Sequence, residues 1–156
     1  DWSSDVCSSD LTVYIDSRSE KFEQQDLSGQ TDALCGVYAP EENAIYIRSD
    51  RHPEQADEIF VQQVGYRVYH TMGFEESTIF PKLCAEPGSY LTQVSVPSGE
   101  AREAAIFAEA FMLYHISPDL LKQDAPEVYT YMDLLVKNDG GRATVDDLYI
   151  HHQSEK

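Results

Sequence analysis

The segment GEAREAAIFAEAFMLYH, residues 99–115, constrains this fold more than any other part of the chain. It is rich in alanine, the residue with the highest helix propensity. Ala104, Phe107, Ala108 and Phe111 recur at the three- and four-residue spacing that places side chains on one stripe of a helix. The segment therefore predicts a helix whose stripe is core and has no function of its own.

A second helix is predicted at about residues 53–72. Pro53 suits a first helical position, acidic residues follow it, and Gly73 suits the end of the helix. One apolar stripe consists of Phe60, Val61, Val64, Gly65 and Val68. The neighbouring face carries Ile59, Gln62, Gln63, Tyr66 and His70.

Strand signals precede these helices. LTVYID at 11–16 is rich in β-branched and aromatic residues. CGVYA and AIYIRS flank the turn-forming PEEN at 40–43, so they predict a β-hairpin. Residues 17–33 are expected to form a loop, and residues 75–97 an irregular stretch. Strands followed by helices favour an α+β fold over an alternating α/β fold.

The C-terminal part carries further boundary signals. Ser117-Pro118 predicts a short turn, and Pro126 opens a helix that runs to about Lys137, before Gly140-Gly141. Thr144 is predicted to cap a last helix, VDDLYIHH, at 145–152.

Bulk composition fits one domain and excludes two classes of partner. The chain has 156 residues, of which 42% are hydrophobic, enough for a sizeable core. Its net charge of −17 argues against nucleic acid and against anionic membrane surfaces, which need basic patches. No apolar run approaches the roughly 18 residues of a membrane span, so we expect no stable membrane insertion.

Residues 1–11, DWSSDVCSSDL, resemble the translation of a short-read sequencing adapter and are set aside as non-native. Without Asp1, Asp5 and Asp10 the net charge of −17 becomes −14. We expect a single domain over residues 12–152, continuing upstream in the natural protein, and a tail at 153–156.

The residues themselves offer little catalytic chemistry. No nucleophile elbow, phosphate-binding glycine loop or zinc-ligand spacing is present. His151 and His152 are adjacent, so on a helix they point about 100° apart and predict solvated side chains rather than a metal clamp. His70 predicts a half-buried polar residue. Outside the first eleven residues, Cys35 and Cys84 either pair in an oxidising compartment or remain buried thiols.

The stretch IFAEAFMLYHISPDLLKQDAPEVYTYMD, residues 106–133, resembles the signature region of the anthrax lethal factor-like family of zincin metallopeptidases. In that family a His-Glu-x-Gly-His helix lies upstream of the F-A-E-A-F helix. FVQQVGY falls at that place, with Gly65 matching the family's glycine, and the hairpin matches the family's small sheet. The likeness covers about residues 12–137. It implies a zincin-like, lethal factor-type α+β fold, with a small, mostly N-terminal sheet packed on several helices.

The resemblance also locates an active site, and all five of its positions depart from the family pattern. The family's two histidine ligands would fall on Gln62 and Tyr66, and its glutamate ligand on Ala105. The glutamate that acts as general base would fall on Gln63, and the tyrosine that helps to stabilise the transition state on Ser98. Zinc needs donors of the His, Glu or Cys kind, and an amide is not a usable base. The sequence therefore predicts a pseudo-metallopeptidase that uses neither a metal nor a cofactor.

One acidic residue of the signature survives. Glu109 in FAEAF is expected to pair with a donor such as Tyr66 or Gln62, which would fill the polar space left by the metal.

Within the family the closest likeness is to the metal-free N-terminal copy in lethal and edema factors, which docks on the protective antigen oligomer. It implies a secreted bacterial toxin module, with a protective antigen-like pore as partner. The segment between FAEAF and Ala125-Pro126 would supply the contact surface. Candidate contacts are Tyr114, His115, Asp119, Leu120 and Leu121. For both leucines the alternative is packing at the helix junction. The alternative function is a diverged secreted metalloendopeptidase domain, now a pseudoenzyme with a peptide-binding or regulatory role.

Overall fold

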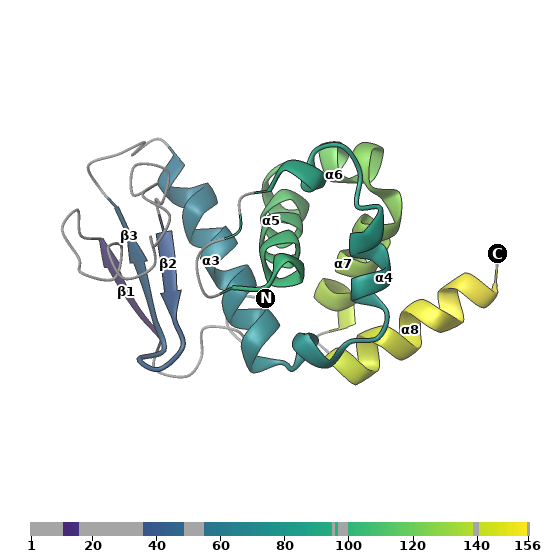
Figure 1. Ribbon diagram of the computed structural model, residues 1–156, viewed down its shortest axis with the longest axis horizontal. Helices are drawn as coiled ribbons and strands as arrows, with labels where there is room; N and C mark the ends of the chain where they lie inside the picture. Colours follow the sequence, from purple (N-terminus) through teal and green to yellow (C-terminus); the bar gives the residue numbers. More distant parts are fainter. Residues whose placement is uncertain are drawn as a thin grey trace.

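The computed structural model describes residues 11–15, 36–48, 55–94, 96, 100–138 and 141–155. Its fold is α+β, as predicted: a small three-stranded sheet lies at one side of the molecule and the helices at the other (Figure 1). The strands are β1 (Thr12–Ile15), β2 (Gly36–Ala39) and β3 (Ala44–Ile47). The helices are α3 (Ala56–Thr71), α4 (Phe80–Ala85), α5 (Arg102–Ile116), α6 (Pro118–Asp124), α7 (Pro126–Asn138) and α8 (Arg142–Ser154), with 3-10 turns η2 (Phe74–Glu76) and η3 (Leu91–Gln93).

The sheet has the order β1-β3-β2. Strands β2 and β3 are antiparallel and form the predicted hairpin, and β1 pairs with β3 in parallel. The hairpin turn contains Asn43 in the left-handed region, at φ 49°. Arg67 of α3 is almost fully buried, and its Nε donates a hydrogen bond of 3.0 Å to Asn43 Oδ1. The buried guanidinium thus ties the turn of the sheet to the helix beneath it.

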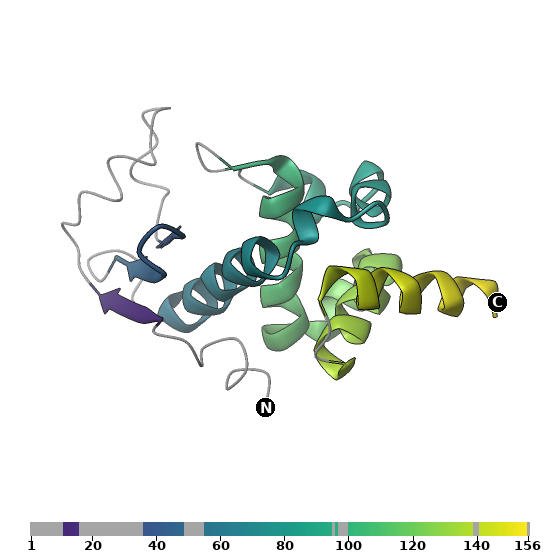
Figure 2. The same cartoon turned by 90° about the horizontal axis from the view of Figure 1, so that it is seen from below.

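Helix α3 lies between the sheet and α5, so it is covered on two sides (Figures 1 and 2). Two glycines allow these close approaches. A Cβ on Gly36 of β2 would lie 2.5 Å from Ile59 Cγ2, and a Cβ on Gly65 of α3 would lie 2.9 Å from Ala108 Cα. Because α3 is enclosed, Gln63 and Tyr66 of its neighbouring face are buried together with Val64, Gly65 and Val68 of the predicted apolar stripe. Phe60 and Val61 of that stripe are only partly buried.

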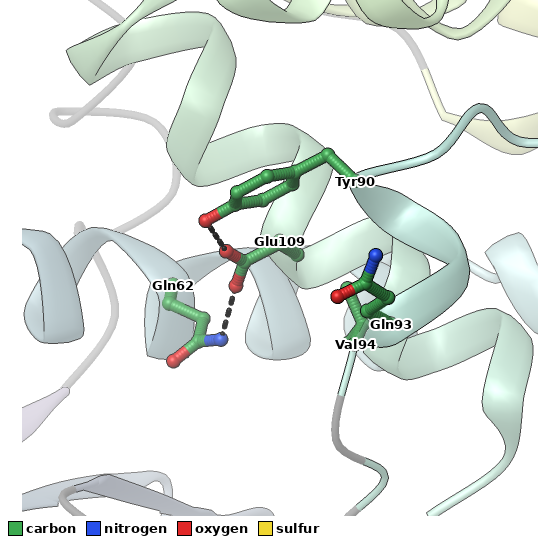
Figure 3. A pocket seen from close by; sticks show the side chains of 5 residues that line it. All are labelled: Gln62, Tyr90, Gln93, Val94 and Glu109. Carbon is green, nitrogen blue, oxygen red and sulfur yellow. Dashed lines mark hydrogen bonds between the residues drawn. The ribbon is translucent and has the colours of Figure 1, made fainter.

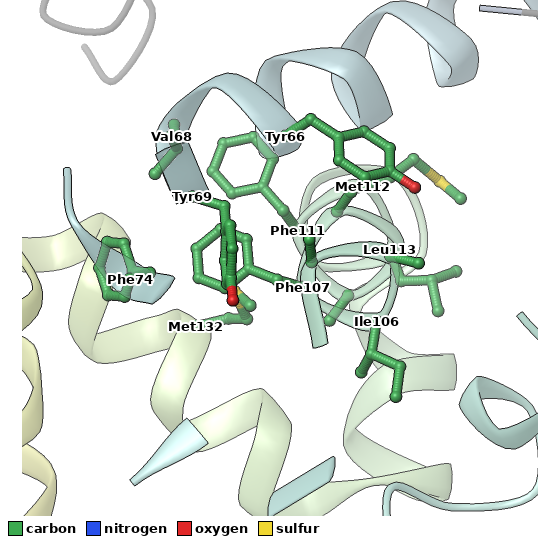
Figure 4. Packing of buried hydrophobic residues seen from close by; sticks show 14 of the residues in the cluster. Tyr66, Val68, Tyr69, Phe74, Ile106, Phe107, Phe111, Met112, Leu113 and Met132 are labelled. Carbon is green, nitrogen blue, oxygen red and sulfur yellow. The ribbon is translucent and has the colours of Figure 1, made fainter. Parts of the chain in front are cut away.

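Helix α5 forms the centre of the core, and the four residues of its predicted stripe are at most 1% exposed. Phe107 packs against the rings of Tyr69, Phe74 and Phe80 at centroid distances of 4.9 to 5.4 Å (Figure 4). Edge-on and tilted contacts of this kind add to the free energy gained by burying the rings. The helix prediction for this segment is confirmed.

Two short helices were not predicted. The stretch 75–97 was expected to be irregular, but it contains α4, with Pro81 in its first turn. The backbone N–H groups of Ile79 and Phe80 donate to Ser77 Oγ just before this helix. Ser117-Pro118 was expected to form a turn but instead begins α6, in which Leu121 is buried and anchors the helix to the core.

The last helix also differs from its prediction. Helix α8 begins at Arg142 after Gly141, so Thr144 lies inside it and does not cap it. The reason is a tertiary contact, because the Arg142 N–H donates to the Met72 carbonyl just after α3. The helix continues to Ser154, two residues into the segment set apart as a tail.

Helix α8 is held to the rest of the fold by a buried polar group. Asp146 is 5% exposed, and its Oδ1 accepts hydrogen bonds from Tyr131 (2.7 Å) and Ser77 (2.9 Å). These bonds join α7 and the segment before α4 to α8.

Two further sequence-based expectations can be followed in the described residues. None of the helices described there is long and apolar enough to cross a membrane. Cys84 is a free, buried thiol, whereas Cys35, Ser98 and Pro53 lie outside the described residues.

Candidate functional site

A pocket of about 370 Å³ opens beside the crossing of α3 and α5. Gln62 of α3 and Glu109 of α5 line one side, and Tyr90, Gln93 and Val94 line the other (Figure 3). Four of the five lining residues carry polar side chains, and the single charged group among them is the carboxylate of Glu109. The pocket is therefore polar and carries a negative charge.

Glu109 is the residue on which the polar contacts of this pocket converge. Its Oε2 accepts a hydrogen bond of 2.6 Å from Gln62 Nε2, and its Oε1 accepts one of 3.2 Å from the Tyr90 hydroxyl. Burial raises the pKa of Glu109 above its ordinary value, and the two hydrogen bonds oppose that rise because they favour the charged carboxylate. The sequence left two donors open for Glu109, and Gln62 is the one that the structure joins to it.

The helix crossing brings Gln62 and Glu109 together. Gly65 lies one helical turn after Gln62, and Ala108 directly precedes Glu109. Because Gly65 has no Cβ, the backbones of α3 and α5 approach closely at Ala108, and the two polar side chains meet at the rim of this contact.

Asp124 positions the opposite wall of the pocket. Its Oδ1 and Oδ2 accept hydrogen bonds from the backbone N–H groups of Ser89 (3.2 Å) and Tyr90 (3.0 Å). Gly88 precedes them at φ 97°, where a Cβ would lie 2.5 Å from the Asp124 carbonyl oxygen. The carboxylate before α7 therefore fixes the segment that carries Tyr90 and leads into η3.

Three other positions that the resemblance assigns to the active site lie among the described residues, and they do not line the pocket. Gln63 is 4% exposed and lies under β2, where a Cβ on Gly36 would lie 3.1 Å from Gln63 Nε2. Tyr66 is buried in the hydrophobic cluster with Phe111 and Met112 (Figure 4), and Ala105 is fully buried. Burial raises the pKa of the Tyr66 phenol, with Glu100 and Glu109 adding to the effect.

This donor set does not fit zinc. Gln62 presents an amide that already donates to Glu109, Tyr66 a neutral phenol inside the core, and Ala105 no donor atom. Within the part of the chain that the structure describes, no three His, Cys, Asp or Glu residues are grouped so that they could hold a metal ion. The pocket presents the amides of Gln62 and Gln93, the Tyr90 hydroxyl and the Glu109 carboxyl group.

His70 has the half-buried environment that the sequence predicts. Its Nε2 lies 3.0 Å from Glu100 Oε2, and its Nδ1 lies 3.5 Å from Glu75 Oε2. The hydrogen bond with Glu100 raises the pKa of His70, and burial opposes that rise.

The candidate partner contacts around α5 and α6 divide into exposed and buried residues. Asp119 is exposed, Leu120 is 41% exposed, and Leu121 is 1% exposed. Leu121 is therefore a core residue at the helix junction, which is the alternative that the sequence left open, and it offers no surface to a partner.

The two aromatic candidates are partly buried. The Tyr114 hydroxyl donates a hydrogen bond of 2.6 Å to Asp133 Oδ1 on α7. The His115 ring packs on Phe111 and on Tyr114, and burial lowers its pKa. Both rings are partly exposed, and their contacts also hold α5 to its neighbours.

Sequence reasoning missed the three pocket residues that follow α4. Tyr90, Gln93 and Val94 lie in the stretch expected to be irregular, where no periodicity distinguishes them. The position of Tyr90 depends on a contact between distant parts of the chain, the hydrogen bonds that the Ser89 and Tyr90 backbone N–H groups donate to the Asp124 carboxylate. Only knowledge of that contact could have pointed to these residues.

Comparisons of the chain with known protein families, with curated proteins and with solved structures give no match.

Proposed function

We propose that this chain is a catalytically inactive, lethal factor-like domain that acts as a protein-docking module of a secreted bacterial toxin. Its partner would be a protective antigen-like translocation oligomer. The observation that carries the proposal is the pairing of Gln62 with Glu109 at 2.6 Å. Gln62 would stand at a zinc-ligand position of the family. Its amide instead donates a hydrogen bond that joins α3 to α5, the two helices that would hold the metal in the family.

The docking surface would lie at the junction of α5 and α6. In this stretch of the chain Ile116 and Leu120 are each 41% exposed, Asp119 is exposed, and the rings of Tyr114 and His115 are partly exposed. Exposed aliphatic side chains surrounded by aromatic and charged groups are typical of the centre and rim of a protein interface.

Capture on an immobilised protective antigen-like oligomer tests this proposal. Leu120→Asp should weaken capture by about tenfold or more, because it places a charge in the apolar centre of the interface. Ile150→Asp is the matched control, since Ile150 is 53% exposed on α8, away from this junction. No capture of the unmodified chain, or equal capture of both variants, would contradict the docking role.

A second candidate is a pseudoenzyme that binds peptide where the family's cleft would lie. The pocket at Glu109 favours it, because a polar space remains open beside the Gln62–Glu109 pair. Binding of peptides in the absence of any oligomer, with the α5–α6 surface variant unaffected, would select this candidate over docking.

A further inference from the structure

Two hydrogen-bond acceptors face each other across the pocket. Gln93 Nε2 donates to the Ser89 carbonyl at 3.3 Å, which leaves the amide oxygen of Gln93 on the side of Glu109 (Figure 3). Glu109 holds one donor on each oxygen, from Tyr90 and from Gln62. A carboxylate oxygen accepts more than one hydrogen bond, so both oxygens retain capacity toward the open side.

The described lining of the pocket is acidic, and a second carboxylate lies nearby. None of the five lining residues is basic, and Glu58 on α3 lies near enough to raise the pKa of Glu109 and of Tyr90. A carboxylate and an amide carbonyl that face the same space are complementary to a group that carries positive charge and several N–H donors. Such a group would also relieve the repulsion between the two glutamates.

We propose that the pocket between η3 and the α3–α5 crossing is a recognition site for a basic side chain, lysine or arginine, presented by a protein partner. The ammonium or guanidinium group binds between the Glu109 carboxylate and the Gln93 amide oxygen. The aliphatic stem lies toward Val94 and the Tyr90 ring, in a pocket of about 370 Å³. This inference rests on the proposed role as a protein-binding module and adds the chemistry of one anchor residue.

Binding of n-butylammonium, observed by the backbone and side-chain amide signals in two-dimensional NMR, tests the site without any partner. The side-chain amides of Gln62 and Gln93 should shift in a saturable way, and the neutral isostere 1-butanol should leave them unchanged. Ethylguanidinium should act on the same signals, since arginine falls within the proposed class.

Three variants locate the charge recognition. Glu109→Gln removes the charge at nearly constant shape, and its amide can still pair with Gln62 and Tyr90, so the fold should persist. It should weaken butylammonium binding by about tenfold or more. Gln93→Met removes the facing acceptor at similar volume from an exposed position and should also weaken binding. Glu86→Gln is the matched control, because it makes the same charge change at an exposed residue outside the pocket.

The outcomes separate this inference from the docking proposal. Equal shifts in the unmodified chain and in Glu109→Gln, or shifts spread over the acidic surface, would overturn the pocket as a basic-side-chain site. If butylammonium binds at Gln93 but no oligomer captures the chain, the site stands and the docking role fails. If capture occurs and the probe does not bind, docking stands and this inference fails.

Discussion

Gly65→Ala should destabilise the protein, although the same change stabilises most helices. At an ordinary interior helix position, replacing glycine by alanine contributes about 1 kcal/mol of stability. At Gly65 the new Cβ would lie 2.9 Å from Ala108 Cα, 3.1 Å from the Ala108 carbonyl oxygen and 3.1 Å from Phe111 Cβ. Two of these three atoms belong to the backbone of α5, so no side-chain rotation can relieve the contact.

The two helices must therefore separate, and the separation loosens the core around Phe107 and Phe111. Inserting a methyl group into a closely packed interior costs about 1 to 3 kcal/mol, and more where backbone must move. Because backbone must move at Gly65, the cost should lie in the upper part of this range, at about 2 to 3 kcal/mol. Subtracting the gain in helix propensity of about 1 kcal/mol leaves a net loss of about 1 to 2 kcal/mol. For a chain of this size that loss lowers the Tm by roughly 2 to 8 °C.

Reversible thermal and urea unfolding of both proteins, followed by circular dichroism, measures the effect. Gly141→Ala serves as a control without steric overlap: the nearest atom to its Cβ would be the Met72 carbonyl oxygen at 3.7 Å, an ordinary contact, so any loss there reflects only the N-cap position before α8. Ala108→Gly combined with Gly65→Ala should not rescue stability, because the clash is with backbone atoms of Ala108. A higher Tm for Gly65→Ala than for the unmodified chain would refute the close crossing of α3 and α5.

Three further results are expected. Burial raises the pKa of the Cys84 thiol to about 12, so near pH 8 the thiol should be unreactive in the native protein. N-ethylmaleimide should therefore leave Cys84 unmodified in the native protein and label it in denaturant. Rapid labelling of the native protein, detected by mass spectrometry, would contradict the burial of Cys84. Glu100 raises the pKa of His70 in the folded protein above the value of about 6.5 that histidine has in the unfolded chain. The contact therefore stabilises the fold fully below about pH 6.5. This stabilisation is lost as the pH rises through the pKa of His70 in the folded protein. Glu100→Gln should thus cost up to about 1 kcal/mol near pH 5 and less near pH 9, and a cost independent of pH would sink this assignment. Asn43→Ala should lower the free energy of unfolding by about 2 to 4 kcal/mol, because alanine is strained at a φ of 49° and loses the hydrogen bond from Arg67. Asn43→Gly tolerates this φ and should lose only the hydrogen bond. Equal losses for the two variants in urea unfolding would show that the φ angle contributes nothing.

Local patterns were enough to predict the hairpin and the two long helices. The turn-forming residues Pro40–Asn43 with the segments that flank them, and the alanine-rich stripe of α5, each specify one structure within a few residues of chain. The pairing of Gln62 with Glu109 was also accessible, because a polar residue on the face of each packed helix needs a partner.

The short helices and half of the pocket could not be predicted in this way. Helices of six and seven residues, such as α4 and α6, are too short to show a period, and burial of Leu121 stabilises α6 from outside its own sequence. The start of α8 depends on the Met72 carbonyl, and Tyr90 is placed by Asp124. Each of these contacts joins segments that lie far apart in the sequence.

The zinc content of the purified chain distinguishes a metal-free domain from a metalloenzyme. The chain should be purified with zinc present, dialysed without chelator and analysed by mass spectrometry of the metal. With Gln62, Tyr66 and Ala105 at the positions that the resemblance assigns to the zinc ligands, we expect less than about 0.1 zinc per chain and no rise in Tm on adding zinc. A content close to one zinc per chain, together with a rise in Tm on adding zinc, would contradict the proposal of a metal-free binding module. It would favour a zinc enzyme instead.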